Sequence, residues 1–134
     1  MRDLLLFIAV LPDVIIQREI TQFKEYLSEH FGASHALKSP PHITLFPPFK
    51  WQEARIDELK TALDEFAAAA EAFELSLKNF NAFRPRVIYV DVEHNEALIK
   101  LQNKLEAFLE SELQLKNERD QHGFNPHITI AHKT

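Results

Sequence analysis

The apolar positions near the start of the chain predict a strand followed by a helix. Residues 4–10 are apolar without interruption, and Pro12 and Asp13 follow shortly after, a pattern typical of a buried central strand that leads to a helix N-cap. Further along, apolar residues recur at helical steps of three and four positions: Ile16, Ile20, Phe23, Leu27 and Phe31. Gly32 then stands where a left-handed residue commonly ends a helix. We therefore predict a buried strand over 4–10 and a helix from Asp13 to Gly32.

The second part of the chain repeats this order of elements. Residues 87–92 are rich in β-branched side chains and predict a strand, after which a helix is expected with an apolar face made by Leu98, Leu101, Leu105, Phe108 and Leu109. Between the two parts, the Ala-rich segment 53–72 predicts a further helix. Apolar and polar residues alternate over 73–78, which predicts a half-exposed strand, and we expect a turn over 79–84.

One short stretch occurs twice, each time after a predicted strand and helix. Residues 41–45 read Pro-His-Ile-Thr-Leu and residues 126–130 read Pro-His-Ile-Thr-Ile. Each half of the chain therefore has the order strand, helix, loop and His-x-Thr strand. We interpret the chain as a degenerate duplication within a single domain over 1–134, because its length is that of one compact domain.

The repeated stretch places a histidine and a threonine on the same face of a strand. Residues two apart in a strand point to the same side, so His42 projects with Thr44 and His127 projects with Thr129, while the residues between them point to a core. If the two halves pack about a pseudo-twofold axis, the two imidazoles face each other across a cleft.

Two imidazoles and two hydroxyls suit phosphodiester chemistry. The reaction needs a base that activates water or a hydroxyl and an acid that protonates the leaving oxygen, and imidazole can fill both roles near neutral pH. Threonine hydroxyls can donate to the non-bridging phosphate oxygens, where negative charge develops. The motifs therefore predict a metal-independent phosphodiesterase that acts on RNA-type or cyclic phosphate esters without a cofactor.

The composition of the chain limits the kinds of molecule that it is expected to bind. With a formal net charge of −5, the chain lacks the basic field that attracts long duplex nucleic acid, so we expect a small nucleotide or a short RNA end as substrate. Two glycines leave no Gly-rich loop that could cradle phosphates. The absence of Cys excludes a disulfide scaffold, and the apolar run from Leu4 to Leu11 is too short to span a bilayer. We expect a cytoplasmic monomer without a membrane partner.

Other interpretations of the two motifs stay open. A single His-x-Thr pair is commonly a surface pair or a buried histidine satisfied by a neighbour, although two matched copies argue against coincidence. His42 and His127 could bind a metal ion together with His122 or His132, although neither motif strand supplies a carboxylate beside its histidine. The cleft could also bind a nucleotide or an RNA end without turnover.

At these residues the sequence resembles the 2H phosphoesterase superfamily, which includes bacterial and archaeal 2'-5' RNA ligase-like proteins and cyclic nucleotide phosphodiesterases. The resemblance covers essentially the whole chain. Residues 5–10 with Pro12 are similar to the family's opening strand, and residues 80–90 are similar to the segment that leads into its second half. Residues 124–131 match most fully.

The resemblance implies a fold and an activity. The implied fold is α+β and bilobal, a pseudo-twofold duplication with two antiparallel sheets around a central cleft and helices outside. His42 and His127 are then the acid-base pair, and Thr44 and Thr129 bind phosphate. Family members open 2',3'-cyclic phosphates or ADP-ribose cyclic phosphate, cleave or form 2'-5' linkages, or trim RNA ends, and they are not tied to a metal. The resemblance thus implies a hydrolase with ligase activity as an option.

Two departures from the family concern the end of the chain. Many relatives carry Arg soon after the second motif, at a position where this chain has His132, so a phosphate-binding cation here should be weaker or pH-dependent. The sequence stops at Thr134, before a further strand of the ligase-like members, so we expect a minimal second lobe.

Five more side chains are candidate substrate contacts. Phe46, Phe49 and Trp51 follow the first motif, and one of them could stack on a nucleobase, although a core role is the default expectation. Arg119 and His122 precede the second motif in a predicted loop, where residues that contact substrates are common, although solvated loop residues are commoner.

Overall fold

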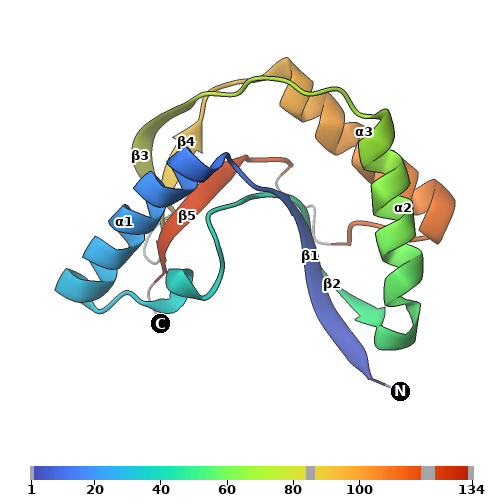
Figure 1. Ribbon diagram of the computed structural model, residues 1–134, viewed down its shortest axis with the longest axis horizontal. Coiled ribbons are helices and arrows are strands. Elements are labelled where there is room, and N and C mark those ends of the chain that lie inside the picture. Colours follow the sequence, from blue (N-terminus) through green and yellow to red (C-terminus); the bar gives the residue numbers. More distant parts are fainter. Residues whose placement is uncertain (1, 84–86, 119–122, 133–134) are drawn as a thin grey trace. The chain divides into compact units, whose positions relative to one another are not determined.

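Two small sheets and three α-helices make up the part of the chain that the computed structural model describes, which is residues 2–83, 87–118 and 123–132 (Figure 1). The elements follow in the order β1 (Asp3–Val10), α1 (Val14–Phe31), η1 (His35–Lys38), β2 (Ile43–Gln52), η2 (Glu53–Arg55), α2 (Ile56–Ala69), β3 (Leu77–Phe83), β4 (Val87–Val92), α3 (Glu96–Leu113) and β5 (His127–His132). β1 pairs with β2, and the other sheet has the order β3-β4-β5. Both sheets are antiparallel: the Glu53 amide after β2 donates to the Arg2 carbonyl before β1, and β4 runs antiparallel to both neighbours. The predicted α+β class is confirmed.

The chain divides into two compact units, each built from separated segments. Unit 1 comprises residues 1–8, 45–75 and 95–125, with most of β1 and β2 together with α2 and α3. Unit 2 comprises residues 9–44, 76–94 and 126–134, with α1, η1 and the three-stranded sheet. Neither unit is a continuous half of the sequence. The single domain, the pseudo-twofold duplication and the central cleft stay predictions.

Helix α1 begins and ends where the sequence predicts. The Asp13 side chain accepts a hydrogen bond from the Ile16 amide at 2.9 Å, which satisfies one of the free donors of the first turn. Gly32 has φ of 69° and ends the helix in the left-handed conformation, with its amide donating to the Ser28 carbonyl. The predicted apolar face is only partly covered, since Ile20 is 3% exposed but Phe31 is 73% exposed. Among the described residues, no helix has the length and apolar character needed to cross a membrane.

Strand β1 forms as predicted, but the prediction that it is a buried central strand is wrong. Among the described residues β2 is its only partner strand, and Leu5 and Phe7 remain 66% and 44% exposed. A continuous apolar run shows which residues can form a strand, but it does not show how many neighbours the strand will have.

The strand predicted over 73–78 and the turn predicted after it are also misplaced. The strand that forms is β3, and it covers most of the segment expected to turn. β3 pairs with β4 in the register Phe80 opposite Val90 and Ala82 opposite Ile88. Pairing with β4 therefore outweighs the low strand propensity of the Asn residues in this segment.

The core of unit 1 lies where α3 meets its neighbours. Leu98, Leu105 and Leu109 on α3 are buried, as the helical spacing predicts. α2 packs beside α3, and the rings of Phe66 and Phe108 contact each other at 5.2 Å between centroids. The predicted helices in both regions are confirmed, although residues 53–55 form the turn η2 before α2 begins.

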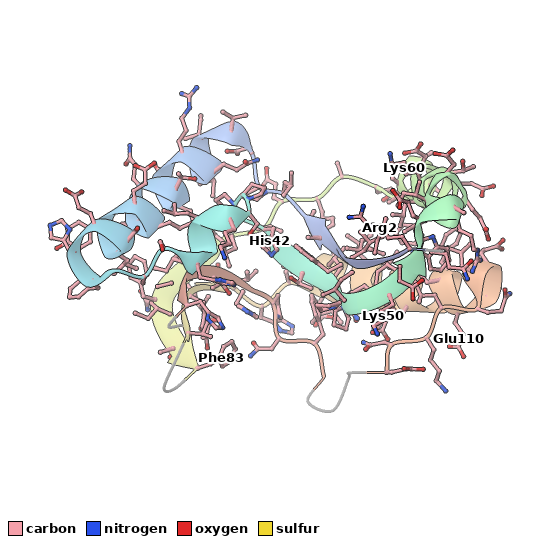
Figure 2. All side chains as sticks on the ribbon, turned by 90° about the horizontal axis from the view of Figure 1, so that it is seen from below. Arg2, His42, Lys50, Lys60, Phe83 and Glu110 are labelled. Carbon is pink, nitrogen blue, oxygen red and sulfur yellow. The ribbon has the colours of Figure 1, made fainter. Side chains whose placement is uncertain are left out.

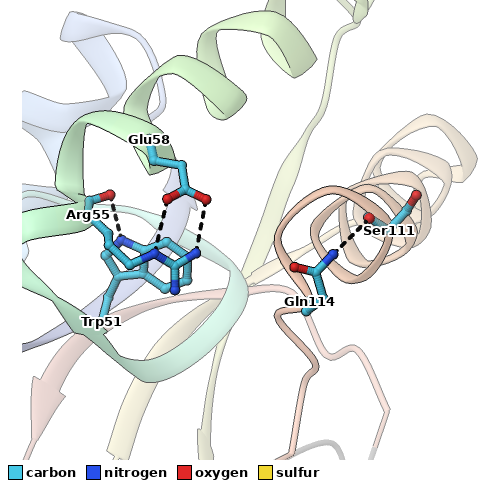
Figure 3. A network of polar contacts seen from close by, with 5 residues as sticks. All are labelled: Trp51, Arg55, Glu58, Ser111 and Gln114. Carbon is cyan, nitrogen blue, oxygen red and sulfur yellow. Dashed lines mark hydrogen bonds and ion pairs between the residues drawn. The ribbon is translucent and has the colours of Figure 1, made fainter.

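A cluster of polar contacts joins the end of β2 to the start of α2 (Figure 3). Trp51 Nε1 donates to the Arg55 carbonyl at 2.9 Å, and the Arg55 guanidinium lies 4.3 Å from the centre of the Trp51 ring. Arg55 also donates two hydrogen bonds to the Glu58 carboxylate, at 3.0 and 2.9 Å. This bidentate pair lowers the pKa of Glu58. On α3, Gln114 donates to the Ser111 carbonyl.

The core of unit 2 lies between α1 and one face of the three-stranded sheet (Figure 1). Val90 and Ile128 lie opposite each other across β4 and β5, and both are buried. The Phe80 ring contacts Phe23 of α1 edge to face at 5.1 Å between centroids. The opposite face of this sheet carries the second motif.

Candidate active site

The first His-x-Thr motif lies where the chain enters β2. His42 directly precedes the strand, as Figure 2 shows, and Thr44 is the second residue of the strand. The His42 Nδ1 atom lies 2.8 Å from the Pro40 carbonyl oxygen. A carbonyl can only accept a hydrogen bond, so Nδ1 carries a proton and the neutral ring has its lone pair at Nε2. Ile43, between the two polar residues, is 1% exposed and anchors the motif in a core.

The second motif opens strand β5. In the register of β4 with β5, His127 lies opposite Asp91 and Thr129 lies opposite Tyr89. Opposed residues point to the same face of an antiparallel pair, so these four side chains share a face. Ile128 points to the other side and is fully buried. The predicted separation of polar and apolar faces is therefore present on β5.

Two aromatic rings flank the His127 imidazole. The centroids of Phe83 and Tyr89 each lie 5.0 Å from the centroid of His127, both in edge-to-face geometry. Phe83 and Tyr89 stack on each other at 4.2 Å, and Tyr89 is only 5% exposed. Contacts with rings from two neighbouring strands, of which Tyr89 is buried, restrict the rotation of the imidazole.

A bulge in β5 brings His132 to the same face as the motif. Tyr89 lies opposite Thr129, but the next residue of β4, Ile88, lies opposite Ala131, so β5 has one extra residue at Ile130. Ile130 and Ala131 are both buried, 2% and 4% exposed. The alternation therefore restarts one position later, and His132 joins His127 and Thr129 instead of facing the core.

His132 has a second histidine beside it. Its ring centroid lies 5.2 Å from that of His35, which is in the turn η1. Turn η1 packs against β5. Among the described residues, the buried Nδ1 atom of His132 has no hydrogen-bond partner. Sequence reasoning gave His35 no role, because nothing in the spacing of the two residues indicates their contact.

Both His-x-Thr motifs belong to unit 2, which also holds His132. The three aromatic candidates after the first motif lie in β2 and are buried: Phe46 is 1%, Phe49 is 9% and Trp51 is 5% exposed. They occupy the core role that was the default expectation, and they leave little ring surface for a nucleobase. Arg119 and His122 lie outside the described residues.

No group of three His, Asp or Glu side chains within residues 2–83, 87–118 and 123–132 is arranged to hold a metal ion. His122, one of the alternative ligands considered for a metal site, is not among these residues.

Lys24 is a further residue near the first motif that sequence reasoning missed. It lies on α1, is 2% exposed, and donates hydrogen bonds to the segment that precedes His42. A signal was available, because Lys24 interrupts the apolar stripe between Ile20 and Leu27. A lysine on the buried side of a helix has to find polar partners within the fold.

Comparison with known proteins identifies the class. The sequence model described as the 2'-5' RNA ligase superfamily matches residues 11–134. The chain therefore belongs to the 2'-5' RNA ligase superfamily, and its resemblance to the 2H phosphoesterases is confirmed.

Individual relatives carry phosphoesterase names. A protein of Geobacillus sp. (strain WCH70) named "Putative phosphoesterase" is 30% identical over 126 residues, which cover 92% of this chain and 66% of the relative. A protein of Bacillus pumilus with the same name is 36% identical over 96 residues, covering 70% of this chain and 53% of the relative. An RNA 2',3'-cyclic phosphodiesterase of Thermotoga maritima is 29% identical over 136 residues, covering 93% and 67%. The chain thus spans about two thirds or less of the length of these relatives.

Proposed function

We propose that the chain is a phosphodiesterase that opens 2',3'-cyclic phosphates or cleaves 2'-5'-linked RNA or nucleotide esters, with His42 and His127 as its acid-base pair. The observation that carries the proposal is the presence of both His-x-Thr motifs in one compact unit of a chain from this superfamily. The name of the Thermotoga maritima relative supports a cyclic phosphate as substrate.

The proposed reaction on a 2',3'-cyclic phosphate moves two protons. One imidazole accepts a proton from water as the water oxygen bonds to phosphorus, and the other gives a proton to the ribose oxygen as its bond to phosphorus breaks. The product is a phosphomonoester with one free hydroxyl, and the two rings regain their starting states by exchange with solvent. At His42 the transferring atom is Nε2, because Nδ1 is engaged with the Pro40 carbonyl. Thr44 and Thr129 donate to the non-bridging oxygens.

His132 is proposed as a phosphate contact that depends on pH. It shares a face with His127 and Thr129 because of the bulge in β5. An imidazole loses its charge at alkaline pH, whereas a guanidinium keeps it. The substitution His132→Arg should therefore raise kcat/KM several-fold at alkaline pH and much less at acidic pH. An equal effect at both ends of the pH range would contradict this role.

The test of the acid-base pair compares three alanine variants. The purified chain is incubated with 2',3'-cyclic nucleotides, ADP-ribose cyclic phosphate and 2'-5'-linked oligonucleotides, with and without a chelator. His42→Ala and His127→Ala should each lower kcat/KM on the order of 10² to 10⁴-fold. The matched control is His30→Ala, because His30 is also a histidine of unit 2 whose Nδ1 contacts a backbone carbonyl, that of Tyr26 at 3.0 Å.

The outcomes separate the alternatives. Unchanged turnover in both the His42 and the His127 variant would refute the acid-base roles. Tight binding without turnover in the unsubstituted chain would favour a nucleotide-binding or RNA-end-binding module. Loss of turnover on chelation would favour the metal-site alternative.

A further inference from the structure

Lys24 is a charged residue in the interior of unit 2. It is 2% exposed, and its Nζ atom donates to the Ala36 carbonyl at 2.8 Å and to the Ser39 carbonyl at 2.9 Å. Both acceptors are neutral backbone carbonyls. The ammonium group therefore joins helix α1 to the backbone on both sides of Leu37 and Lys38, just ahead of the first motif.

The energetic balance indicates that Lys24 fixes the position of its carbonyl partners more than it stabilises the fold. Moving an ammonium group out of water is unfavourable, and burial therefore lowers the pKa of Lys24. Two hydrogen bonds from a charged donor roughly offset that cost. A leucine at this place would continue the apolar stripe without the desolvation penalty. What the lysine adds is a fixed location for two carbonyl groups.

We call the two hydrogen bonds from Lys24 to the Ala36 and Ser39 carbonyls the Lys24 clamp. Few rotatable bonds separate the Lys24 clamp from the His42 ring. Ser39, which accepts from Lys24, is followed by Pro40 and Pro41, and both prolines have a fixed φ. Ser39 itself is extended, with φ −135° and ψ 154°, as expected before a proline. The next polar contact along the chain is the hydrogen bond from His42 Nδ1 to the Pro40 carbonyl. The position of that carbonyl is therefore set by the clamp through a stiff segment.

We propose that Lys24 is a positioning residue for His42: it fixes the Pro40 carbonyl, which holds the proton on Nδ1 and directs Nε2 to the reaction. The catalytic consequence rests on the proposed function, whereas the effect on the protonation of the ring does not. A ring nitrogen that bonds to a carbonyl has to carry the proton, and the other nitrogen of the neutral ring is then left with the lone pair.

The test uses Lys24→Met, which keeps the unbranched apolar stem of the side chain and removes the donor. In the ¹⁵N-labelled chain, long-range ¹H–¹⁵N spectra at a pH where the ring is neutral should show His42 with its proton on Nδ1. In Lys24→Met the ring should become a mixture of both tautomers. The kcat should fall on the order of tenfold to hundredfold with little change in KM, because the substrate still binds but the transferring atom is misplaced.

Three further variants make the result specific. Lys24→Arg keeps a charged donor and should restore most of the Nδ1 tautomer and of the turnover. Lys60→Met is the matched control, since Lys60 is an exposed lysine on α2 (Figure 2), and it should leave both readouts unchanged. Pro40→Ala leaves Lys24 intact but loosens the segment, and it should shift the tautomer in the same direction by a smaller amount. Pro40 is exposed, so this variant tests whether the Pro40 carbonyl positions the His42 ring even where Lys24→Met does not fold.

The outcomes are distinct from those of the proposed function. An unchanged tautomer in Lys24→Met, or in Pro40→Ala where the first variant does not fold, would overturn the positioning role. A changed tautomer with unchanged turnover would overturn the link to catalysis. A chain that turns over no phosphodiester at all would refute the proposed function, and the tautomer measurement would still decide whether Lys24 positions the ring.

Discussion

Ile128 lies between the two polar residues of the second motif and is 0% exposed, so Ile128→Ala measures how firmly the motif is anchored. The transfer of the lost atoms to water is worth roughly 2.5 kcal/mol, at about 0.8 kcal/mol per buried methylene. The cavity that remains should raise the loss in free energy of unfolding to about 3–4 kcal/mol. For a chain of this length, that corresponds to a fall in Tm of about 10–14 °C.

Ile88→Ala is the matched control for this prediction. Ile88 lies on the same face of the same sheet, opposite Ala131, but it is 39% exposed. Its removal opens a gap to solvent instead of a closed cavity, and it should cost about 1 kcal/mol. Urea unfolding of both variants, followed by circular dichroism, gives the two free energies. If Ile88→Ala destabilised the chain as much as Ile128→Ala, the reasoning that the closed burial of Ile128 sets its larger cost would be refuted.

Three more predictions concern α1. Asp13→Ala removes the bond to the Ile16 amide and should lower the free energy of unfolding by about 1 kcal/mol, while Asp13→Asn should retain most of the stability in the same urea experiment. Gly32→Ala should cost about 1 kcal/mol through its positive φ alone, because no atom lies within 4 Å of the added Cβ, and an equally stable variant would contradict the left-handed cap. Burial lowers the pKa of Lys24 in the folded chain below 10.5, its value in the unfolded chain. At pH values between these two pKa values the unfolded chain binds more protons than the folded chain. The free energy of unfolding of the unsubstituted chain should therefore rise with pH relative to that of Lys24→Met. A difference between the two chains that does not grow as the pH rises toward 10.5 would contradict this linkage.

Local signals were enough to predict most helices and strands. Asp13 and Gly32 mark the ends of α1 because capping depends on neighbouring backbone groups, which lie within one helical turn. The helical spacing of Leu98, Leu105 and Leu109 predicts the buried face of α3 for a similar reason. The strand β3 was misplaced because its position depends on pairing with β4, which short-range patterns do not contain.

The candidate site was predicted from the sequence alone, from the repeated Pro-His-Ile-Thr stretch. Residue types and their period of two determine that His127 and Thr129 share a face of a strand, with Ile128 on the other side. Family membership rests on the match over 11–134.

The tertiary structure decided what surrounds these residues. Strict alternation would place His132 on the side opposite His127, and only the extra residue at Ile130 in the pairing of β5 with β4 brings it to the same face. The contacts of His132 with His35 and of Lys24 with the Ser39 carbonyl likewise join segments that are far apart or unpatterned in sequence. A periodic sequence specifies the direction of each side chain within its own element. Strand pairing and helix packing, which depend on distant residues, determine which of those directions meet.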